Sequence, residues 1–517
     1  MSQVFRLFIP IFYLMVGYAI YVTWPDRSFQ VDNPPAAPEM AMLDDGGGQA
    51  VAVALDPAGG DAQTPSNATS NNTISAVESP LDTQVALAVP SDALPASPSL
   101  SGLGSGSTAA VPMPQIPAVV APPVFSADEQ DTSQVAIAVA QVAINECVQT
   151  ACSEIEFRDV NLSDLDGLLN DLQGVESLFF LNGNFDQTGV LSVMRRLQNL
   201  ILTDTNVTNP DSLAELIGLK SLQLEDSSLE SLDPIRRMTG LEVLNVPDTD
   251  IGSLDAVAGL TGLRRIDVSR TGVRSLEPLR NKSALESVFL RDTAIADLSP
   301  LSASPILRRV VAAGSDIDDL SGISRALELR VLDLENTRVR DLRPIRNLTG
   351  ITFLNIAGTD VSDVSTLRAI QGLSVIDLSR TPVTNIQGLE GFTELRRIFL
   401  RGTNVQDFSP LRRSTKLVEL DLEGSPVNNF WAFTTLESLQ VLNVAQTNVR
   451  DLAPLLRLPN LRQLDVSRTP ITDLDALLNM PSLQEVILNF DELQKVDAIK
   501  SADKNFWFRI RDVRLTN

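Results

Sequence analysis

A repeat of 22 residues runs through most of this chain and constrains its fold more than any other feature. Leucine, in one case isoleucine, stands at every twenty-second position from 197 to 483, and apolar residues follow three and five places later. Val175, with Leu178 and Phe180, extends the series upstream, so fifteen units follow one another without an insertion. A unit this short cannot bury its apolar side chains alone, so the pattern predicts stacked units that share a continuous core.

Each unit follows the pattern LxxLxLxxTxVxDLxPLxxxxx. Its fourth and sixth places are apolar while the fifth varies, which is the period of two expected for a strand with one buried face. The remaining residues suffice for a tight return but not for a full helix. The pattern therefore predicts an α/β-type solenoid, an arc with a parallel sheet on its concave face and short turns or 3-10 segments on its convex side.

The ninth place of the unit is threonine in ten units and serine in three. A hydroxyl at the end of a strand can bond to backbone groups of the turn that would otherwise be buried without a partner. A catalytic nucleophile is a poorer interpretation, because the chain contains no histidine that could act as its base. We therefore expect a structural ladder formed by Thr205, Thr249, Thr271, Thr293, Thr337, Thr359, Thr381, Thr403, Thr447 and Thr469.

From about residue 153 onward the chain resembles leucine-rich-repeat proteins, in particular the 22-residue bacterial class of internalin-like proteins. The resemblance rests on a motif that recurs across most of this region. It implies a horseshoe-shaped or arc-shaped solenoid that binds a partner on its concave strand face. Threonine or serine replaces the asparagine that this family usually has at the ninth place, and the resemblance does not imply host-cell adhesion.

The N-terminus differs in kind from the repeats. Residues 7–24 carry no charge and end in Trp24, a stretch about long enough to cross the ~30 Å hydrocarbon layer of a membrane. A cleaved signal peptide is the alternative, but no small-x-small cleavage site follows the apolar run. We expect an uncleaved transmembrane signal anchor over residues 1–24, with the N-terminus in the cytoplasm and the repeat domain periplasmic or extracellular.

An acidic segment follows the expected anchor. Residues 28–157 contain nine Asp, six Glu and neither Lys nor Arg, and the first part of this stretch is rich in Pro, Ala, Ser and Gly. Such a composition buries too little apolar surface to offset the entropy lost on ordering. Residues 25–127 are therefore expected to form a disordered stalk that holds the repeats away from the membrane.

Both ends of a solenoid need caps, because an open end would expose the core. We expect an N-terminal cap over residues 128–174, repeats over 175–490 and a C-terminal cap over 491–517, with alternating residues near 508 forming an edge strand. The N-terminal cap holds both cysteines of the chain, Cys147 and Cys152. A structural disulfide, which requires a break in any helix there, is favoured over free buried thiols. Two cysteines are too few for a metal site.

The fifth place of each unit should point outward from the concave face. Asp recurs there, Phe appears three times, and Arg follows at the seventh or eighth place in five of these units. Exposed Phe and Arg are typical anchors of protein interfaces. Duplication of ancestral units, with Asp and Arg paired across strands, explains the same pattern. The candidate binding residues are Asp267, Arg270, Phe289, Arg291, Asp377, Arg380, Phe399, Arg401, Asp465 and Arg468.

Composition narrows the function. The absence of histidine removes Ser-His-Asp catalysis and imidazole metal sites, and the net charge of −24 argues against a nucleic-acid partner. We expect no cofactor and no enzymatic activity. The favoured function is a membrane-tethered extracytoplasmic binding or scaffold protein for a protein, a peptide or an envelope polysaccharide. The alternatives are a structural spacer, a cytoplasm-facing scaffold and, less favoured because no insertion builds a pocket, a carboxylate-based glycan-acting enzyme.

Overall fold

The computed structural model describes residues 130–489 and 507–511 of the chain. The expected anchor over residues 1–24, the stalk over 25–127 and all of the expected C-terminal cap except 507–511 lie outside the described residues. Within the described part, no helix combines the length and the apolar character that a membrane span requires.

The N-terminal cap begins with a helix, α2 (Gln130–Thr150). Ala140, Ile144 and Cys147 recur at the spacing of one helix face and are at most 6% exposed, so this face closes the end of the core. The helix stops at Thr150 and the next residue has a φ of +51°, which reverses the chain. Cys152 thereby returns to Cys147, with 4.8 Å between their Cα atoms, and the two form a disulfide.

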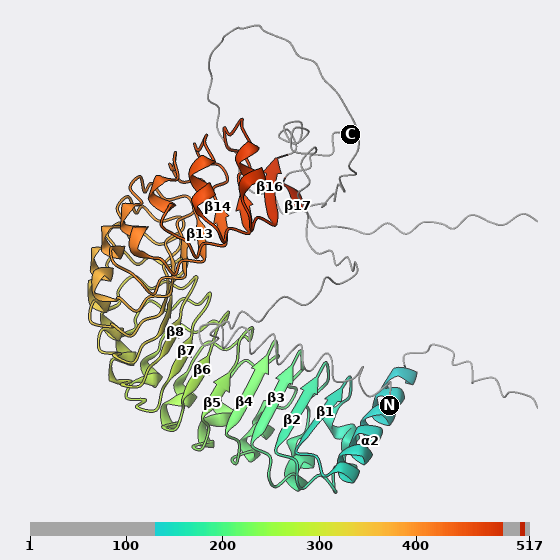
Figure 1. Cartoon of the computed structure of the whole chain (residues 1–517). Coiled ribbons are helices and arrows are strands. Elements are labelled where there is room, and N and C mark those ends of the chain that lie inside the picture. Colours follow the sequence, from blue (N-terminus) through green and yellow to red (C-terminus); the bar gives the residue numbers. More distant parts are fainter. Residues whose placement is uncertain (1–129, 490–506, 512–517) are drawn as a thin grey trace, which may run out of the picture. The chain divides into compact units, whose positions relative to one another are not determined.

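Seventeen strands of the described residues form one parallel sheet, in which each strand pairs with the next along the chain (Figure 1). Successive partners are 22 residues apart, as in the pair Leu332 and Leu354. The sequence did not predict the first strand, because Ile155 precedes its partner Leu178 by one residue more than the repeat. The strands are β1 (Glu154–Arg158), β2 (Ser177–Leu181), β3 (Asn199–Thr203), β4 (Ser221–Glu225), β5 (Val243–Asn245), β6 (Arg265–Asp267), β7 (Ser287–Phe289), β8 (Arg309–Val311), β9 (Val331–Asp333), β10 (Phe353–Asn355), β11 (Val375–Asp377), β12 (Arg397–Phe399), β13 (Glu419–Asp421), β14 (Val441–Asn443), β15 (Gln463–Asp465), β16 (Glu485–Asn489) and β17 (Trp507–Arg511).

Short 3-10 turns return the chain between strands, and within the repeat array they lie on the outer side of the arc while the strands line its inner side (Figure 1). The expected parallel sheet and 3-10 segments are thus confirmed. The turns are η2 (Leu162–Leu165), η3 (Thr188–Val193), η4 (Pro210–Glu215), η5 (Asp233–Arg237), η6 (Asp255–Gly259), η7 (Glu277–Leu279), η8 (Ser299–Ala303), η9 (Ser321–Ile323), η10 (Arg343–Ile345), η11 (Ser365–Ala369), η12 (Gln387–Leu389), η13 (Ser409–Arg413), η14 (Trp431–Phe433), η15 (Ala453–Arg457) and η16 (Asp475–Asn479).

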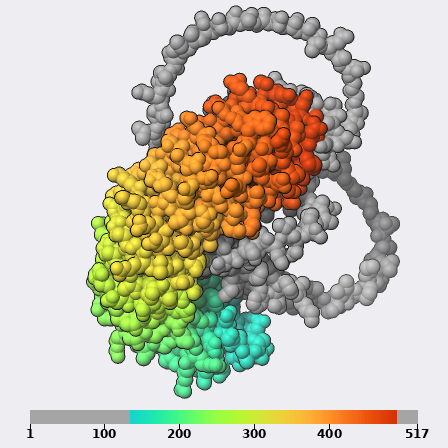
Figure 2. Space-filling view, turned by 60° about the vertical axis from the view of Figure 1, so that its left-hand side comes forward, coloured from blue at the N-terminus to red at the C-terminus, as the bar shows by residue number. Residues whose placement is uncertain are grey.

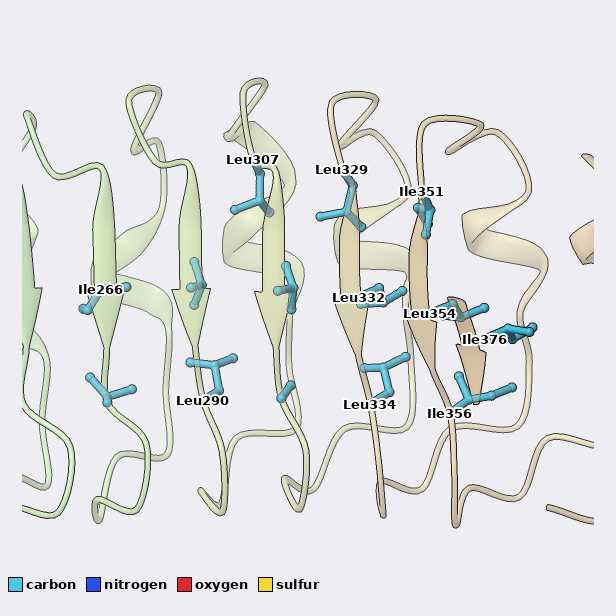
Figure 3. Close-up of a cluster of buried hydrophobic side chains, with 14 of the residues drawn as sticks. Ile266, Leu290, Leu307, Leu329, Leu332, Leu334, Ile351, Leu354, Ile356 and Ile376 are labelled. Carbon is cyan, nitrogen blue, oxygen red and sulfur yellow. The ribbon is translucent and has the colours of Figure 1, made fainter. Parts of the chain in front are cut away.

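The core is a continuous column of apolar side chains between the sheet and the turns. In one unit, Leu329, Leu332 and Leu334 all point inward and none is exposed to solvent (Figure 3). Leu354 and Ile356 repeat the arrangement in the next unit (Figure 3). Full burial of one such side chain contributes about 1.5–3 kcal/mol, and only a neighbouring unit can bury it. The units accordingly stack without a break along the array (Figure 2).

The ninth-place hydroxyls bond to the backbone, except that of Ser425, which is buried without a hydrogen-bond partner among the described residues. In nine of the ten threonine units the Oγ1 donates to the carbonyl three residues earlier, as from Thr359 to Ile356 at 2.7 Å. Thr205 instead donates to the carbonyls of Thr203 and Phe180. These side chains are buried, so the bonds satisfy carbonyl groups that water cannot reach.

The eighth place is conformationally special in every described unit from 182 to 468. Its φ is positive in all fourteen cases, between +51° and +71°, which is the left-handed region. Glycine, asparagine and aspartate tolerate this conformation and fill ten of the positions. Arg270, Arg380, Gln446 and Arg468 fill the other four, although their side chains offer no such conformational advantage. The left-handed residue turns the chain away from the sheet after each strand.

Replacing Thr359 by valine should lower the free energy of unfolding by about 1 kcal/mol, because the shape is kept while a buried hydrogen bond is lost. Thermal unfolding of the purified full chain measures the change. Thr359→Ser is the matched control, since it keeps the hydroxyl that serine supplies at 315, where it donates to Ala312. A valine variant no less stable than the serine variant would contradict the role of the hydroxyl column.

Candidate binding surface on the strand face

The third and fifth places of each unit flank a fully buried fourth place, so their side chains emerge on the inner face of the sheet. From β7 to β12 six of these twelve places are apolar, the fifth place in three strands and the third place in the other three. Val331, Phe353 and Val375 are direct neighbours across three strands, and Phe289 is paired with Val311 in the same way. We call Phe289, Val311, Val331, Phe353, Val375 and Phe399 the apolar strip.

The strip is not uniformly accessible. Phe289 is only 6% exposed, so the expectation that it is an exposed anchor is wrong. The cause is Arg265 on the preceding strand, whose guanidinium lies 4.5 Å from the centroid of the Phe289 ring and covers it. Phe353, Val375 and Phe399 are half-buried and therefore form the accessible part of the strip.

The aspartates of the fifth place are held by their own backbone. Asp267 accepts a hydrogen bond from the backbone N–H two residues ahead at 3.0 Å, and Asp377 and Asp465 do the same at 2.8 and 2.9 Å. Asn355 and Asn443 make the same bond without a charge. The side chain thus stabilises the turn that leaves the strand, a local role that the sequence pattern alone did not indicate.

Four of the five candidate arginines pair with carboxylates of other units. Arg291 reaches Asp333, two units away, at 2.5 Å. Arg401 lies 2.9 Å from Asp421 and 3.2 Å from Glu423. Two further pairs join Arg270 with Asp248 and, at 3.0 Å, Arg380 with Glu335.

Five acidic partners were therefore missed by the sequence analysis. Three of them could have been found, because Glu335 and Glu423 share the seventh place with Arg291 and Arg401, and Asp248 shares the eighth place with Arg270. Arg468 occupies that eighth place in its own unit, with a φ of +56°. Non-glycine residues pay about 1 kcal/mol in this conformation, so the arginines are kept there at a conformational cost.

Burial sets the electrostatics of this face. It raises the pKa of Asp267, Asp333 and Asp377 above the ordinary value, against the hydrogen bonds and nearby guanidinium groups that favour the charged form. On the outer side, Asp363 has the opposite shift. The backbone N–H and hydroxyl of Ser365 stabilise its charged form, and its pKa is lowered. Asp363 and Asp377 accept the same kind of backbone bond, yet their pKa values shift in opposite directions because Asp377 is desolvated and Asp363 is in water.

Asp377→Asn should raise stability at neutral pH, because asparagine keeps the turn bond, as Asn355 shows, without burying a charge. A raised folded-state pKa means that the wild-type penalty disappears as pH falls through that pKa towards the unfolded value of about 3.9. The difference in melting temperature should therefore shrink on acidification. Asp363→Asn is the control of opposite sign and should lower stability at pH 7. A destabilised Asp377→Asn variant at pH 7 would contradict this account.

The likeness of this chain to known proteins lies in its repeats. A family model described as leucine-rich repeats in two copies matches residues 437–501. No curated protein matches the sequence. Among solved structures, an internalin of Listeria monocytogenes, InlF, is similar with a TM-score of 0.53 at 17% identity, over 67% of this chain and 93% of that one.

Two other structures show the same likeness. A leucine-rich-repeat protein of Leptospira interrogans has a TM-score of 0.59 at 17% identity, over 66% of this chain and 91% of that one. The plant peptide hormone receptor RGFR1, in complex with RGF2, has a TM-score of 0.50 at 16% identity, over 64% and 62% of the two chains. At these identities the likeness concerns the fold alone. The chain therefore contains leucine-rich repeats, and its described part has the solenoid fold of internalins and other leucine-rich-repeat proteins.

Proposed function

We propose that the chain is a membrane-tethered, extracytoplasmic binding protein whose repeat array holds a protein or peptide against the apolar strip. The observation that carries the proposal is that Phe353, Val375 and Phe399, on three consecutive strands, are accessible on a face whose charges are largely paired. Apolar and aromatic side chains at the centre of a surface, with charged groups around them, are the arrangement found at the energetic centres of interfaces.

The surrounding ion pairs support binding by fixing the surface in advance. Asp333 is 4% exposed and holds Arg291, while Asp421 and Glu423 hold Arg401 beside Phe399. Because these side chains are already ordered, less conformational entropy is lost when a partner binds this face. The parallel strands themselves are fully paired within the array, so recognition rests on side chains rather than on strand addition.

The plant receptor with a similar fold is bound to RGF2, which supports a peptide or protein as the ligand class for a solenoid of this kind. The disulfide between Cys147 and Cys152 supports a location outside the cytoplasm, because such bonds persist in oxidising compartments. The uncharged run of residues 7–24 supports the tether.

A photo-crosslinking amino acid at Val375 in the full chain should form covalent adducts with a protein in intact cells, whereas the same group at Ile217, an exposed residue of the outer side, should not. Adding Phe353→Ala and Phe399→Ala should reduce the adduct about tenfold or more, since two central aromatic contacts are removed. Circular dichroism should show unchanged folding. Adducts of equal yield at both sites, or adducts insensitive to the alanine pair, would exclude the strip as the binding surface.

A C-terminal fusion tests the location independently. Alkaline phosphatase, which needs disulfides to become active, should be active when fused to the full chain, and a cytoplasm-dependent fluorescent reporter should be dark. Deleting residues 1–24 should abolish the phosphatase signal, because the span that directs export is gone. Activity of the cytoplasmic reporter alone would show that the repeats face the cytoplasm.

A further inference from the structure

A second surface lies on the outer side of the array, at the ends of the 3-10 turns from η9 to η15. The eighteenth and nineteenth places of these seven consecutive units contain six arginines and a single acidic residue, Glu390. All six arginines are exposed. We call this row, formed by Arg325, Arg346, Arg368, Arg412, Arg413 and Arg457, the convex ridge.

The ridge is electrostatically unlike the strand face. Arg368 pairs with Glu390 at 3.1 Å, but no carboxylate of the described residues lies within ion-pair distance of the other five ridge arginines. On the strand face, by contrast, Arg291, Arg380 and Arg401 are all matched. Of the five ridge arginines without a close ion pair, Arg412 interacts electrostatically with Asp407. Exposed guanidinium groups without a close ion pair attract an anionic partner.

Apolar side chains stand among these arginines. Leu327, Trp431 and Leu456 are 61%, 57% and 42% exposed, and the guanidinium of Arg457 lies 5.8 Å from the Trp431 ring. The indole is presented on a rigid support. Its neighbours Phe430 and Phe433 are fully buried in the core. An exposed, firmly supported indole beside a cation offers a flat surface for an apolar ring face.

The shape and bonding of the ridge favour one kind of anion. The turns close on themselves, as when the N–H of Phe433 donates to the carbonyl of Phe430, so they offer a peptide backbone little to pair with. A planar bilayer would meet the outer side of an arc at few turns, whereas a flexible chain can follow it (Figure 2). A polyuronate carries a carboxylate for the guanidinium forks and an apolar C–H ring face for the indole on each sugar.

We propose that the convex ridge binds a linear acidic polysaccharide, with its carboxylates on the arginines from η9 to η15 and a sugar ring on Trp431. Successive units are about 4.8 Å apart at the strands and more widely spaced outside, so one polymer chain can contact several turns together. Each exposed contact is weak, and the affinity comes from their number along a single chain. Binding should therefore weaken as salt is raised.

The test uses the full chain and a fluorescein-labelled homogalacturonan oligomer, with binding followed by fluorescence anisotropy at low and physiological salt. Arg412→Glu together with Arg413→Glu should weaken binding about tenfold or more, because two charge-assisted contacts become repulsive. Trp431→Ala should weaken it about threefold to tenfold. The matched control is Arg236→Glu with Arg237→Glu, which makes the same charge change at the same two places of η5 and should alter affinity by less than about twofold.

Several outcomes would overturn the proposal. These are undetectable binding of the oligomer at low salt, an equal loss in the η5 control, or binding of uncharged dextran at the same affinity. Tighter binding of poly-glutamate would assign the ridge to acidic peptides, and binding only of vesicles containing phosphatidylglycerol would assign it to lipid. Phe353→Ala with Phe399→Ala should leave oligomer binding unchanged, so this result is independent of ligand binding at the strand face.

Discussion

Every part of this structure depends on the contact between the inward side chains of one unit and those of the next. Leu332 and Leu354 occupy the same place 22 residues apart, and neither has any exposed surface. A single unit is too small to bury them, so the units are stable only as a stack. The recurrence of the apolar places is thus a packing requirement of the stack.

That requirement fixes what the other places of a unit can do. Once the strand and the return path are set, the residue that ends each strand must turn sharply, and the eighth place has a positive φ in every described unit from 182 to 468. The polar side chains on either side of this turn then bond to the backbone. Thr359 does so from the buried side and Asp377 from the strand face. These residues recur because every unit must form the same turn, and no ligand is needed to explain the pattern.

The strand face and the outer side of the array differ in how their charged side chains are arranged. On the strand face the side chains crowd together, burial raises the pKa of Asp333, and Arg291 is drawn into a close pair. On the outer side the turns diverge, and Arg325, Arg346 and Arg413 stand in water without a partner among the described residues. The first surface is suited to holding apolar groups at its centre, and the second to long-range attraction of anions.

The sequence by itself determined the solenoid, its unit length, the parallel register and the hydroxyl column, because each follows from a period that local counting reveals. It also pointed to Cys147 and Cys152 as a pair. Tertiary structure alone decided which outward residues are accessible. Phe289 and Phe399 have the same place in their units, yet Arg265 covers the ring of Phe289. It also decided the arginine partners, since Arg291 passes over one unit to reach Asp333. Which side chains pair depends on their length, their charge and their distance across the curved sheet. The repeat period of the sequence specifies none of these distances.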